Sequence, residues 1–419
     1  MQIERRNELN MTKRSEENAA QLSEASLTDE WLTEWENRVG LDLRVGNVFN
    51  QNVSYEAIRN FSNGIGDNNP LYRDEKYAKR TKYGALIASP SWTASVFPHW
   101  VLQGLPGIHA DHSASDWEFL RPVYLNDRIT PKCKFVGFDV RTSKFAGKTV
   151  FEYQRFEYWN QRAELVSQGY NMLVRYERQT AKKQSAEGKG KYDHIEIPHP
   201  WSPKEQAKVD KDCLAEEIRG SNIRYWEDVN VGDEMTPVVK GVFGLTDMIA
   251  YCVGAAPVQL AAHGVQLRNY KKHPAWGFRD PITGSWEPVY GVHYLVSAAK
   301  GVGAMYAYDV GVQRHCWMVN LFTNWMGDEG WLKSCSAQYR QFVYLSDAVW
   351  FKGKVTSKYV DENGEYCVDI EAHGVNQRGD DTIPTNATVI LPSKEHGTSP
   401  VEKRLPPEEY RGTGKGVYF

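Results

Sequence analysis

The chain has 419 residues, enough for two or three domains, and its 41% hydrophobic and 25% charged residues are ordinary for a globular protein. Fifty Lys and Arg against 53 Asp and Glu leave a net charge of −3, which argues against a nucleic-acid partner, because such proteins carry a basic excess. No apolar run could span a membrane, residues 1–30 hold no apolar signal segment, and the six cysteines form no Cys-x-x-Cys pair. We therefore expect a cytoplasmic protein with no membrane contact, no metal site and no disulfide framework.

Polar segments divide the chain into two bodies of similar length. Residues 1–28 have the composition of a flexible N-terminal arm, residues 177–221 that of a linker, and residues 394–419 form a tail with several Pro and Gly. The bodies between them, residues 29–176 and 222–393, are each long enough for one domain.

Each body is predicted to begin with helices and to continue into long strands. The apolar periodicity predicts helices near 30–38 and at 55–64, 91–102, 202–218, 247–254, 293–303 and 314–326. Alternating apolar residues predict strands at 132–140, 148–159, 165–176, 339–344, 348–359, 366–376 and 382–391. A helix followed by an antiparallel meander, made twice, indicates an α+β fold.

The two bodies are copies of one another. A Val-Tyr-Leu-x-Asp segment ends at Asp127 and again at Asp347, and Asn-Gln-Arg at 160–162 recurs at 376–378. Two further matches, near the start of each body, have an offset of about 190 rather than about 220. Four matches in the same order indicate a duplication, with an insertion at 258–288 in the second copy. Two such units would most simply pair their sheets as a pseudo-dimer.

The most specific motif lies in the first copy. Its residues are Asp67, Asn69, Pro70, Asp74, Ala78, Tyr83 and Gly84. Their types and spacing closely resemble the hydratase motif of the MaoC-like enoyl-CoA hydratases and dehydratases. The position of that family's catalytic His is occupied by Tyr72. The resemblance is specific in the first copy and weak in the second.

The resemblance implies a tandem, or double, hot-dog fold, with two antiparallel sheets that each wrap a central helix. It implies an acyl-CoA or acyl-carrier thioester as substrate, with no cofactor beyond the CoA that the substrate carries, and a homo-oligomer of two or more chains. In the family an Asp and a His hold a water molecule that adds across the 2,3 bond. A backbone N–H at the start of the central helix polarises the thioester carbonyl.

The first copy departs from the family's pattern at the position of the catalytic His. Tyr72 is a poor general base at neutral pH, because the pKa of an unperturbed Tyr is about 10. We therefore expect the first copy to be the substrate-binding half. The residues that the resemblance assigns to substrate binding there are Asn69, Pro70, Tyr72, Tyr83 and Gly84.

The second copy is expected to hold the base. An offset of 221 residues relates Tyr72 to His293 and Ala78 to Ala299. The second pair is Ala in both copies, which supports this alignment of the two copies. Gly311 then falls at the start of the second central helix, as the N–H that polarises the carbonyl, and Arg314 is a candidate contact for CoA or the thioester. Pro288 stands where the family has its Asp, so a carboxylate must come from elsewhere. The candidates are Glu287, Asp280 and Asp67.

The leading hypothesis is an acyl-CoA hydratase or dehydratase, a carbon–oxygen lyase. Because neither copy keeps the full Asp and His pair in place, an alternative is a catalytically silent acyl-thioester-binding protein or partner subunit. A third is a hot-dog thioesterase that uses Asp67 or Asp74. The insertion carries Tyr270, Trp276, Phe278 and Trp286, and we expect it to shape or cover the acyl pocket.

Overall fold

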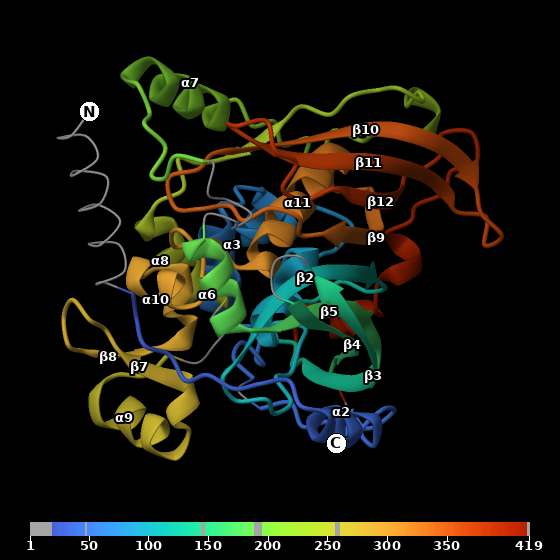
Figure 1. Ribbon diagram of the computed structural model, residues 1–419. Helices are drawn as coiled ribbons and strands as arrows, with labels where there is room; N and C mark the ends of the chain where they lie inside the picture. Colours follow the sequence, from blue (N-terminus) through green and yellow to red (C-terminus); the bar gives the residue numbers. More distant parts are fainter. Residues whose placement is uncertain (1–18, 47, 144–146, 188–194, 256–259, 417–419) are drawn as a thin grey trace.

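The computed structural model describes residues 19–46, 48–143, 147–187, 195–255 and 260–416. One ten-stranded antiparallel sheet runs through it, in the order β1-β3-β4-β5-β2-β9-β12-β11-β10-β6 (Figure 1). In the first copy the strands are β1 (Asp42–Leu43), β2 (Ile108–Phe119), β3 (Thr130–Ser143), β4 (Gly147–Trp159) and β5 (Leu165–Glu177). In the second copy they are β6 (Val238–Lys240), β9 (Trp331–Gln338), β10 (Val349–Val360), β11 (Tyr366–Asn376) and β12 (Thr385–Ile390).

The sheet repeats itself about its centre. Strands β1, β3, β4, β5 and β2 correspond to β6, β10, β11, β12 and β9, so that the order of the second copy mirrors that of the first. β2 pairs with β9 in the middle, where Asp116 lies opposite Ser336 and Trp117 lies opposite Cys335. Asp116 and Ser336 are separated along the chain by the same spacing as the repeated Asp127 and Asp347. The register thus places a pseudo-two-fold axis between Asp116 and Ser336. It confirms the α+β fold of two paired units.

The central helix of the second copy is long and buried. Helix α11 (Gly311–Met326) lies at the centre of the molecule, against β2, β9 and β10 (Figure 1). Every residue from Val312 to Met326 is buried. The helix is therefore apolar or internally hydrogen-bonded on all its faces, as expected for a helix that a sheet surrounds.

The central helix of the first copy is much shorter than the predicted 91–102. It consists of a 3-10 turn η2 (Pro90–Trp92) and one turn of helix, α5 (Thr93–Val96). Phe97 is already extended, with φ of −160° and ψ of 133°. Pro98 explains the stop, because a proline lacks the N–H of a helix interior and disfavours helical geometry at the residue before it.

The two central strands were missed from the sequence, and the predicted strand at 339–344 is wrong. β2 and β9 carry Ser, Asp, His, Lys or Gln at many positions, which hides the apolar alternation. Both lie between neighbours on either side and contact a polar interior rather than a purely apolar one. Residues 339–344 form a loop and a single bridge instead.

Two helices pack tightly through a pair of equivalent glycines. Helices α3 (Tyr55–Ile65) and α8 (Leu245–Ala255) lie side by side (Figure 1). A Cβ atom at Gly64 would lie 2.8 Å from the carbonyl oxygen of Ala250, and one at Gly254 would lie 2.3 Å from that of Asn60. The two glycines are 190 residues apart, which is the offset of the sequence matches near the start of each body. Gly64 and Gly254 are therefore equivalent positions of the two copies.

The repeated Asp and Asn-Gln-Arg motifs build the same buried cluster in both copies. Asp347 is fully buried and accepts hydrogen bonds from the Tyr344 backbone N–H (3.0 Å), from Gln377 (2.7 Å) and from Arg378 (2.6 and 2.7 Å). In the first copy Asp127 accepts from the Tyr124 N–H, Gln161 and Arg162. Each cluster ties the loop after the central strand (β2 or β9) to a turn between two other strands, β4 and β5 or β11 and β12.

We expect Arg378→Ala to destabilise the protein strongly. The substitution leaves the Asp347 carboxylate buried without its cation, which typically costs about 3–5 kcal/mol. The midpoint of urea unfolding should fall well below that of the wild type. Arg141→Ala is the matched control, because Arg141 pairs with Asp139 on the surface, where both side chains are more than half exposed. Equal midpoints for the two variants would contradict the expectation.

The connecting segments are more structured than their composition predicts. The first residues of the expected linker form helix α6 (Arg178–Ala186), in which Ala181 is buried. The expected arm lies outside the described residues as far as residue 18. Beyond it, Ala20 and Leu22 are buried, and the Ala20 N–H donates to the Ser297 carbonyl at 2.9 Å.

The remaining elements complete the fold. They are α2 (Asp29–Glu36), α4 (Glu75–Ala78), α7 (Pro203–Leu214), α9 (His263–Lys272), α10 (Val296–Gly301), the hairpin of β7 (Gly277–Arg279) and β8 (Trp286–Pro288), and the 3-10 turns η1 (Pro70–Tyr72), η3 (Trp226–Asp228), η4 (Pro274–Trp276), η5 (Val289–His293), η6 (Glu402–Arg404) and η7 (Glu408–Tyr410). The insertion comprises α9, η4 and the β7–β8 hairpin and projects away from the sheet (Figure 1).

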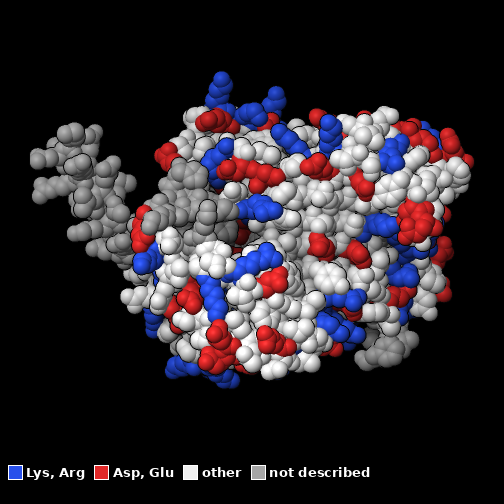
Figure 2. Space-filling view, turned by 45° about the vertical axis from the view of Figure 1, so that its right-hand side comes forward, with Lys and Arg blue, Asp and Glu red and all other residues white. Residues whose placement is uncertain are grey.

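No helix in the described ranges combines the length and apolarity needed to cross a bilayer. On the face seen in Figure 2, acidic and basic side chains are interspersed instead of forming a basic tract.

Candidate functional site

The pseudo-two-fold symmetry defines two equivalent sites, one in each copy. Ile87 forms a bridge with Tyr124, and Tyr308 forms the corresponding bridge with Tyr344. The spacing from Ile87 to Tyr308 equals that from Tyr72 to His293, which supports the register that relates the hydratase motif to the second copy. We call the site around Asp67, Tyr72, Ala88, Pro90 and Thr93 the N-site. We call the site around His293, Tyr308, Asp309, Gly311 and Arg314 the C-site.

His293 ends the turn η5 and is held by one nitrogen. Its Nδ1 lies 2.9 Å from the carbonyl oxygen of Tyr308, and its ring lies edge-on to the Tyr308 ring at 5.1 Å between centroids. A carbonyl can only accept, so Nδ1 carries the proton and Nε2 is the basic nitrogen. Nε2 has no hydrogen-bond partner among the described residues, and the side chain is half-buried. The imidazole is therefore oriented with a free lone pair.

The surroundings keep this imidazole neutral at physiological pH. Burial lowers the pKa of His293 to about 4, opposed by the hydrogen bond to Tyr308 and by the negative charge of Asp309 and Asp111. Asp309 belongs to the same copy, whereas Asp111 lies on β2 of the first copy. Both copies thus contribute charge to the C-site.

Gly311 begins helix α11, and its backbone N–H has no acceptor in the part of the chain that the structure describes. The first N–H groups of a helix have no acceptor within it, and the Gln313 side chain accepts from the Val310 N–H at 3.4 Å, not from that of Gly311. A Cβ atom at position 311 would lie 2.8 Å from the Tyr339 ring and 3.0 Å from the His112 carbonyl oxygen. Only glycine fits here without displacement. The helix dipole adds partial positive charge at this end, which suits a developing oxyanion.

Two of the three predicted carboxylates, Asp280 and Glu287, are engaged by neighbouring side chains and backbone. Asp280 accepts from Ser297 (2.5 Å) and from the Thr283 N–H and hydroxyl (2.9 and 2.8 Å). Although burial opposes it, these hydrogen bonds lower the pKa of Asp280. Its role is to fasten the insertion to α10. Glu287 accepts from Ser285 at 3.0 Å. The carboxylates whose charge raises the pKa of His293, against the effect of burial, are instead Asp309 and Asp111.

Asp309 and Asp111 were missed from the sequence. Asp309 is fully buried and forms a bidentate pair with Arg314, at 2.8 Å to Nε and 2.6 Å to Nη2. Asp111 lies 3.0 Å from His109. The Tyr-Asp-x-Gly segment at 308–311 was a usable signal for Asp309. Asp111 reaches the site only through the pairing of the two copies.

Arg314 was predicted to contact CoA or the thioester, but its donors are occupied inside the protein. Its Nη1 donates to the carbonyl oxygens of Gln341 (2.5 Å) and Thr382 (2.7 Å), while Nε and Nη2 donate to Asp309. The side chain is fully buried. Arg314 therefore has its donors engaged within the protein, and its counterpart in the N-site is the much smaller Thr93.

The N-site keeps the shape of the hydratase motif. Asp67 accepts from the Asn69 N–H at 2.9 Å, and the Asn69 side chain accepts from the Leu71 N–H at 3.0 Å. Pro70 opens the turn η1. Asp67 is 1% exposed, burial raises its pKa to about 6, and its second oxygen has no partner in the described part of the chain.

The chemistry of the motif is absent from the N-site. Tyr72 replaces the His, and burial raises its pKa well above the usual value. Pro90 occupies the position of Gly311, so the N–H that would polarise a carbonyl does not exist. Gly84 takes a φ of +70° in the turn after Tyr83, which is a conformational role.

The N-site contains a small pocket of about 30 Å³ that opens to solvent. Residues of both copies line it, among them Tyr72, Tyr83, Thr93, Phe119, Met326 and Trp331. The motif of the first copy therefore borders a small cavity.

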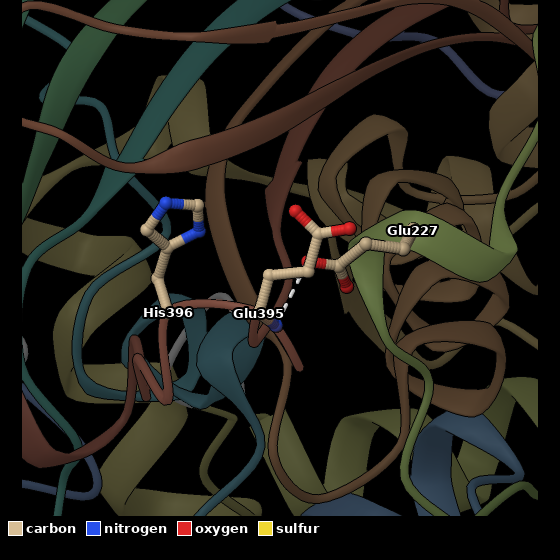
Figure 3. Close-up of side chains that lie close together, drawn as sticks. All are labelled: Glu227, Glu395 and His396. Carbon is tan, nitrogen blue, oxygen red and sulfur yellow. Dashed lines mark hydrogen bonds between the residues drawn. The ribbon is translucent and has the colours of Figure 1, made fainter.

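A third cluster, of Glu227, Glu395 and His396, lies on the C-terminal side of the second copy (Figure 3). Glu227 accepts from the Ser393 hydroxyl and from the N–H groups of Lys394 (3.1 Å) and Glu395 (3.5 Å). Although burial opposes it, these hydrogen bonds lower the pKa of Glu227 to about 2. The cluster therefore acts as an anchor for the turn after β12.

Comparisons with known proteins found sequence relatives of the first copy and solved structures that share the fold of both copies. Residues 43–168 match the family described as the FAS1-like dehydratase domain region. A 3-hydroxybutyryl-CoA dehydratase of Methylorubrum extorquens is 30% identical over 93 residues, which are 22% of this chain and 59% of that protein. A UPF0336 protein of Parafrankia sp. is 29% identical over 131 residues, 29% of this chain and 82% of that protein. The sequence matches thus cover less than a third of the chain.

Similarity of fold extends further. A MaoC-like dehydratase structure covers 85% of this chain and 99% of its own length, with a TM-score of 0.58 and 15% identity. A Mycobacterium tuberculosis protein described as a double hotdog fold covers 85% of this chain and 97% of its own length, with a TM-score of 0.51 and 10% identity. The first copy is thus similar in sequence to a dehydratase region, and both copies together share the fold of MaoC-like and double hot-dog proteins.

Proposed function

We propose that the protein is an acyl-thioester hydratase or dehydratase whose reaction takes place at the C-site. The observation that carries the proposal is that His293 Nδ1 is hydrogen-bonded to the Tyr308 carbonyl, which leaves Nε2 unprotonated, and that Tyr308 lies three residues before Gly311, whose N–H begins α11. Among the described residues, Nε2 is a base with a fixed tautomer and the Gly311 N–H is a donor with no acceptor. Hydration of a 2-enoyl thioester requires both a general base for the water and a donor to the carbonyl oxygen.

The proposed reaction uses His293 for both proton transfers. Nε2 takes a proton from water as the water oxygen adds to Cβ, and the electron pair of the double bond moves toward the thioester oxygen. The Gly311 N–H stabilises the resulting enolate. The imidazolium then returns the proton to Cα, which balances the addition. Asp309 and Asp111 stabilise the transient imidazolium through their charge. Dehydration follows the same steps in reverse.

The first test is a panel of 2-enoyl-CoA esters with aliphatic, aromatic and ring-fused acyl groups. Loss of the absorbance of the conjugated thioester, with the CoA thioester intact, is expected for at least one of them. Silence across the panel together with acyl-CoA binding would favour a catalytically silent binding protein.

We expect an unusual pH dependence of kcat/KM. The base must be neutral to act, and burial lowers the pKa of His293 to about 4. Activity should therefore be level between about pH 5 and 8 and fall as the pH drops through about 4, whereas an unperturbed His would lose activity near 6.5. Circular dichroism at each pH separates titration from unfolding. A loss of activity centred near pH 6.5 would contradict the assignment of His293 as the base.

The insertion is expected to influence the choice of acyl group. Phe278 is buried against Val292 and Ala298, next to the turn that carries His293, while Tyr270 packs on Trp286 within the insertion. Replacing residues 260–286 by a short loop should change the ratio of rates between short and bulky enoyl-CoA esters. A uniform loss of rate would show only weakened support of η5, and an unchanged profile would refute the idea.

A thioesterase has one observation in its favour. Asp67 has an oxygen without a partner in the described ranges, its pKa is raised to about 6, and it belongs to the same motif as the pocket-lining Tyr72. A carboxylate of this kind could activate water for attack on the thioester carbonyl. Release of free CoA thiol, lost in Asp67→Asn, would identify this reaction and separate it from hydration.

A further inference from the structure

The insertion of the second copy is basic, although the rest of the protein is acidic. Residues 258–288 contain four Lys and Arg against two acidic residues, a net charge of +2, so the remaining residues carry −5. Neither acid lies free on the surface. Asp280 is buried and accepts from Ser297 and Thr283, and the half-buried Glu287 accepts from Ser285. The exposed charges of the insertion are therefore all positive.

Helix α9 carries three of these cations. Arg268, Lys271 and Lys272 are exposed, and the helix contains no acidic residue. None of the three has an ion pair or a side-chain hydrogen bond within the described part of the chain. Arg268 lies three and four residues before the two lysines, a spacing at which like charges repel across the surface of a helix. An acidic partner would relieve this repulsion.

The insertion also exposes large apolar side chains. On α9, Val265 shares a face with Arg268 and Lys272, while Tyr270 on another side is buried and packs on Trp286. Exposed apolar area mixed with charge is typical of protein interfaces, whereas a helix that lies on a membrane separates an apolar face from a charged one. The insertion is less than a tenth of the chain but has five of the twenty large apolar side chains that are exposed in the described ranges. They are Leu260, Val265, Trp276, Ile282 and Trp286.

This surface is directly connected to the turn that holds the proposed base. Strand β8 ends at Pro288 and η5 begins at Val289, so that only this turn separates the insertion from His293. Phe278 of β7 is buried in the same apolar cluster as Val292 of η5. A partner bound to α9 would therefore lie beside the C-site.

We infer that α9 and the adjoining turn η4 form a docking surface for an acidic protein that carries the acyl group as a thioester on a phosphopantetheine arm. The choice of an acyl carrier rests on the proposed function. The acidic character of the partner rests on the unpaired cations, because complementary charge steers association and selects the partner. The CoA nucleotide is also anionic, but small ligands are bound in concave sites, and these cations lie on the outside of a helix.

The test compares two ligands that present the same acyl group. One is an acidic acyl carrier protein loaded with a hexanoyl group, and the other is hexanoyl-CoA. Neither has a 2,3 double bond, so binding is measured without turnover. The triple substitution Arg268→Glu/Lys271→Glu/Lys272→Glu should weaken binding of the hexanoyl carrier by about tenfold or more and that of hexanoyl-CoA by less than about twofold. Added salt should weaken the carrier complex of the wild type and bring the two proteins closer together.

The matched control is Lys204→Glu/Lys211→Glu/Lys352→Glu. It makes the same change of net charge at exposed positions of α7 and β10, which lie apart from the insertion (Figure 1). This variant should bind the hexanoyl carrier like the wild type. With a 2-hexenoyl carrier as substrate, the α9 triple variant should raise KM and leave kcat unchanged, because none of its substitutions touches the C-site. Equal thermal unfolding temperatures show that both variants are folded.

Several results would overturn the inference. They are the absence of carrier binding by the wild type, binding that the α9 triple substitution leaves unchanged, and an equal loss for hexanoyl-CoA, which would assign the cations to the nucleotide. Binding to phosphatidylglycerol vesicles that only the α9 variant loses, without carrier binding, would assign the surface to a membrane. Silence in the enoyl-CoA panel leaves the hexanoyl-carrier measurement unaffected, so the two proposals fail in different experiments.

Discussion

His293→Ala is expected to lower kcat for hydration of the best enoyl-CoA ester by about a hundredfold or more, which is the usual effect of removing a general base. KM should change little, because His293 is assigned to the water molecule and not to the acyl chain. The loss is expected in kcat and kcat/KM together, since the interaction exists only as the water attacks. The measurement is the decay of the conjugated-thioester absorbance over a range of substrate concentrations.

Two variants make this result specific. His293→Asn keeps a side-chain N–H that can donate to the Tyr308 carbonyl but has no basic nitrogen, so it should be as inactive as His293→Ala while the thermal unfolding temperature stays near that of the wild type. His273→Ala, on the exposed insertion, is the control for removing a histidine and should be fully active. Near-normal turnover by His293→Asn would remove His293 from the mechanism.

Much of the fold could be predicted because the sheet has a simple periodicity and because the chain repeats it. The predicted strands at 148–159 and 366–376 coincide with β4 and β11. Two internal offsets, near 190 and near 220, located the insertion, and the structure shows both in its contacts: Gly64 with Gly254 across two helices, and Asp116 with Ser336 across the central strands.

The errors in the fold have physical causes that local pattern does not reveal. The predicted helix at 91–102 ends at Val96, since Pro98 imposes an extended Phe97. β2 and β9 alternate poorly because their polar residues have partners of their own: His112 of β2 lies 2.8 Å from Ser115, and Cys335 of β9 lies 3.0 Å from His315. A strand that lines a polar interior loses the signal by which strands are recognised.

The candidate site was partly predictable for the same reason. Register alone led from Tyr72 to His293 and from the helix start to Gly311. The carboxylates followed no such rule, because Asp309 comes after His293 in the chain instead of before it, and Asp111 comes from the other copy. The inward orientation of Arg314 depends on its partners Asp309, Gln341 and Thr382, which meet it only in the folded protein.

The role of the Gly311 N–H can be tested with the residue that the first copy has at the equivalent position, which is Pro90. Gly311→Pro deletes the N–H at the first position of α11, where proline is otherwise well tolerated in a helix. Gly311→Ala is the matched control: it adds the same Cβ, which would meet the Tyr339 ring and the His112 carbonyl, but it keeps the N–H. Both variants should lose some stability from this contact, to a similar extent.

The difference between these two variants isolates the donor. We expect kcat of Gly311→Pro to lie about 10²–10³-fold below that of Gly311→Ala, the range found when one oxyanion donor is removed. Binding of hexanoyl-CoA should weaken much less, because a ground-state carbonyl carries little of the charge that the enolate oxygen develops. Equal kcat values at equal unfolding temperatures would mean that another group stabilises the enolate. The start of α11 would then only position the acyl chain, and His293 would act without a partner from the helix.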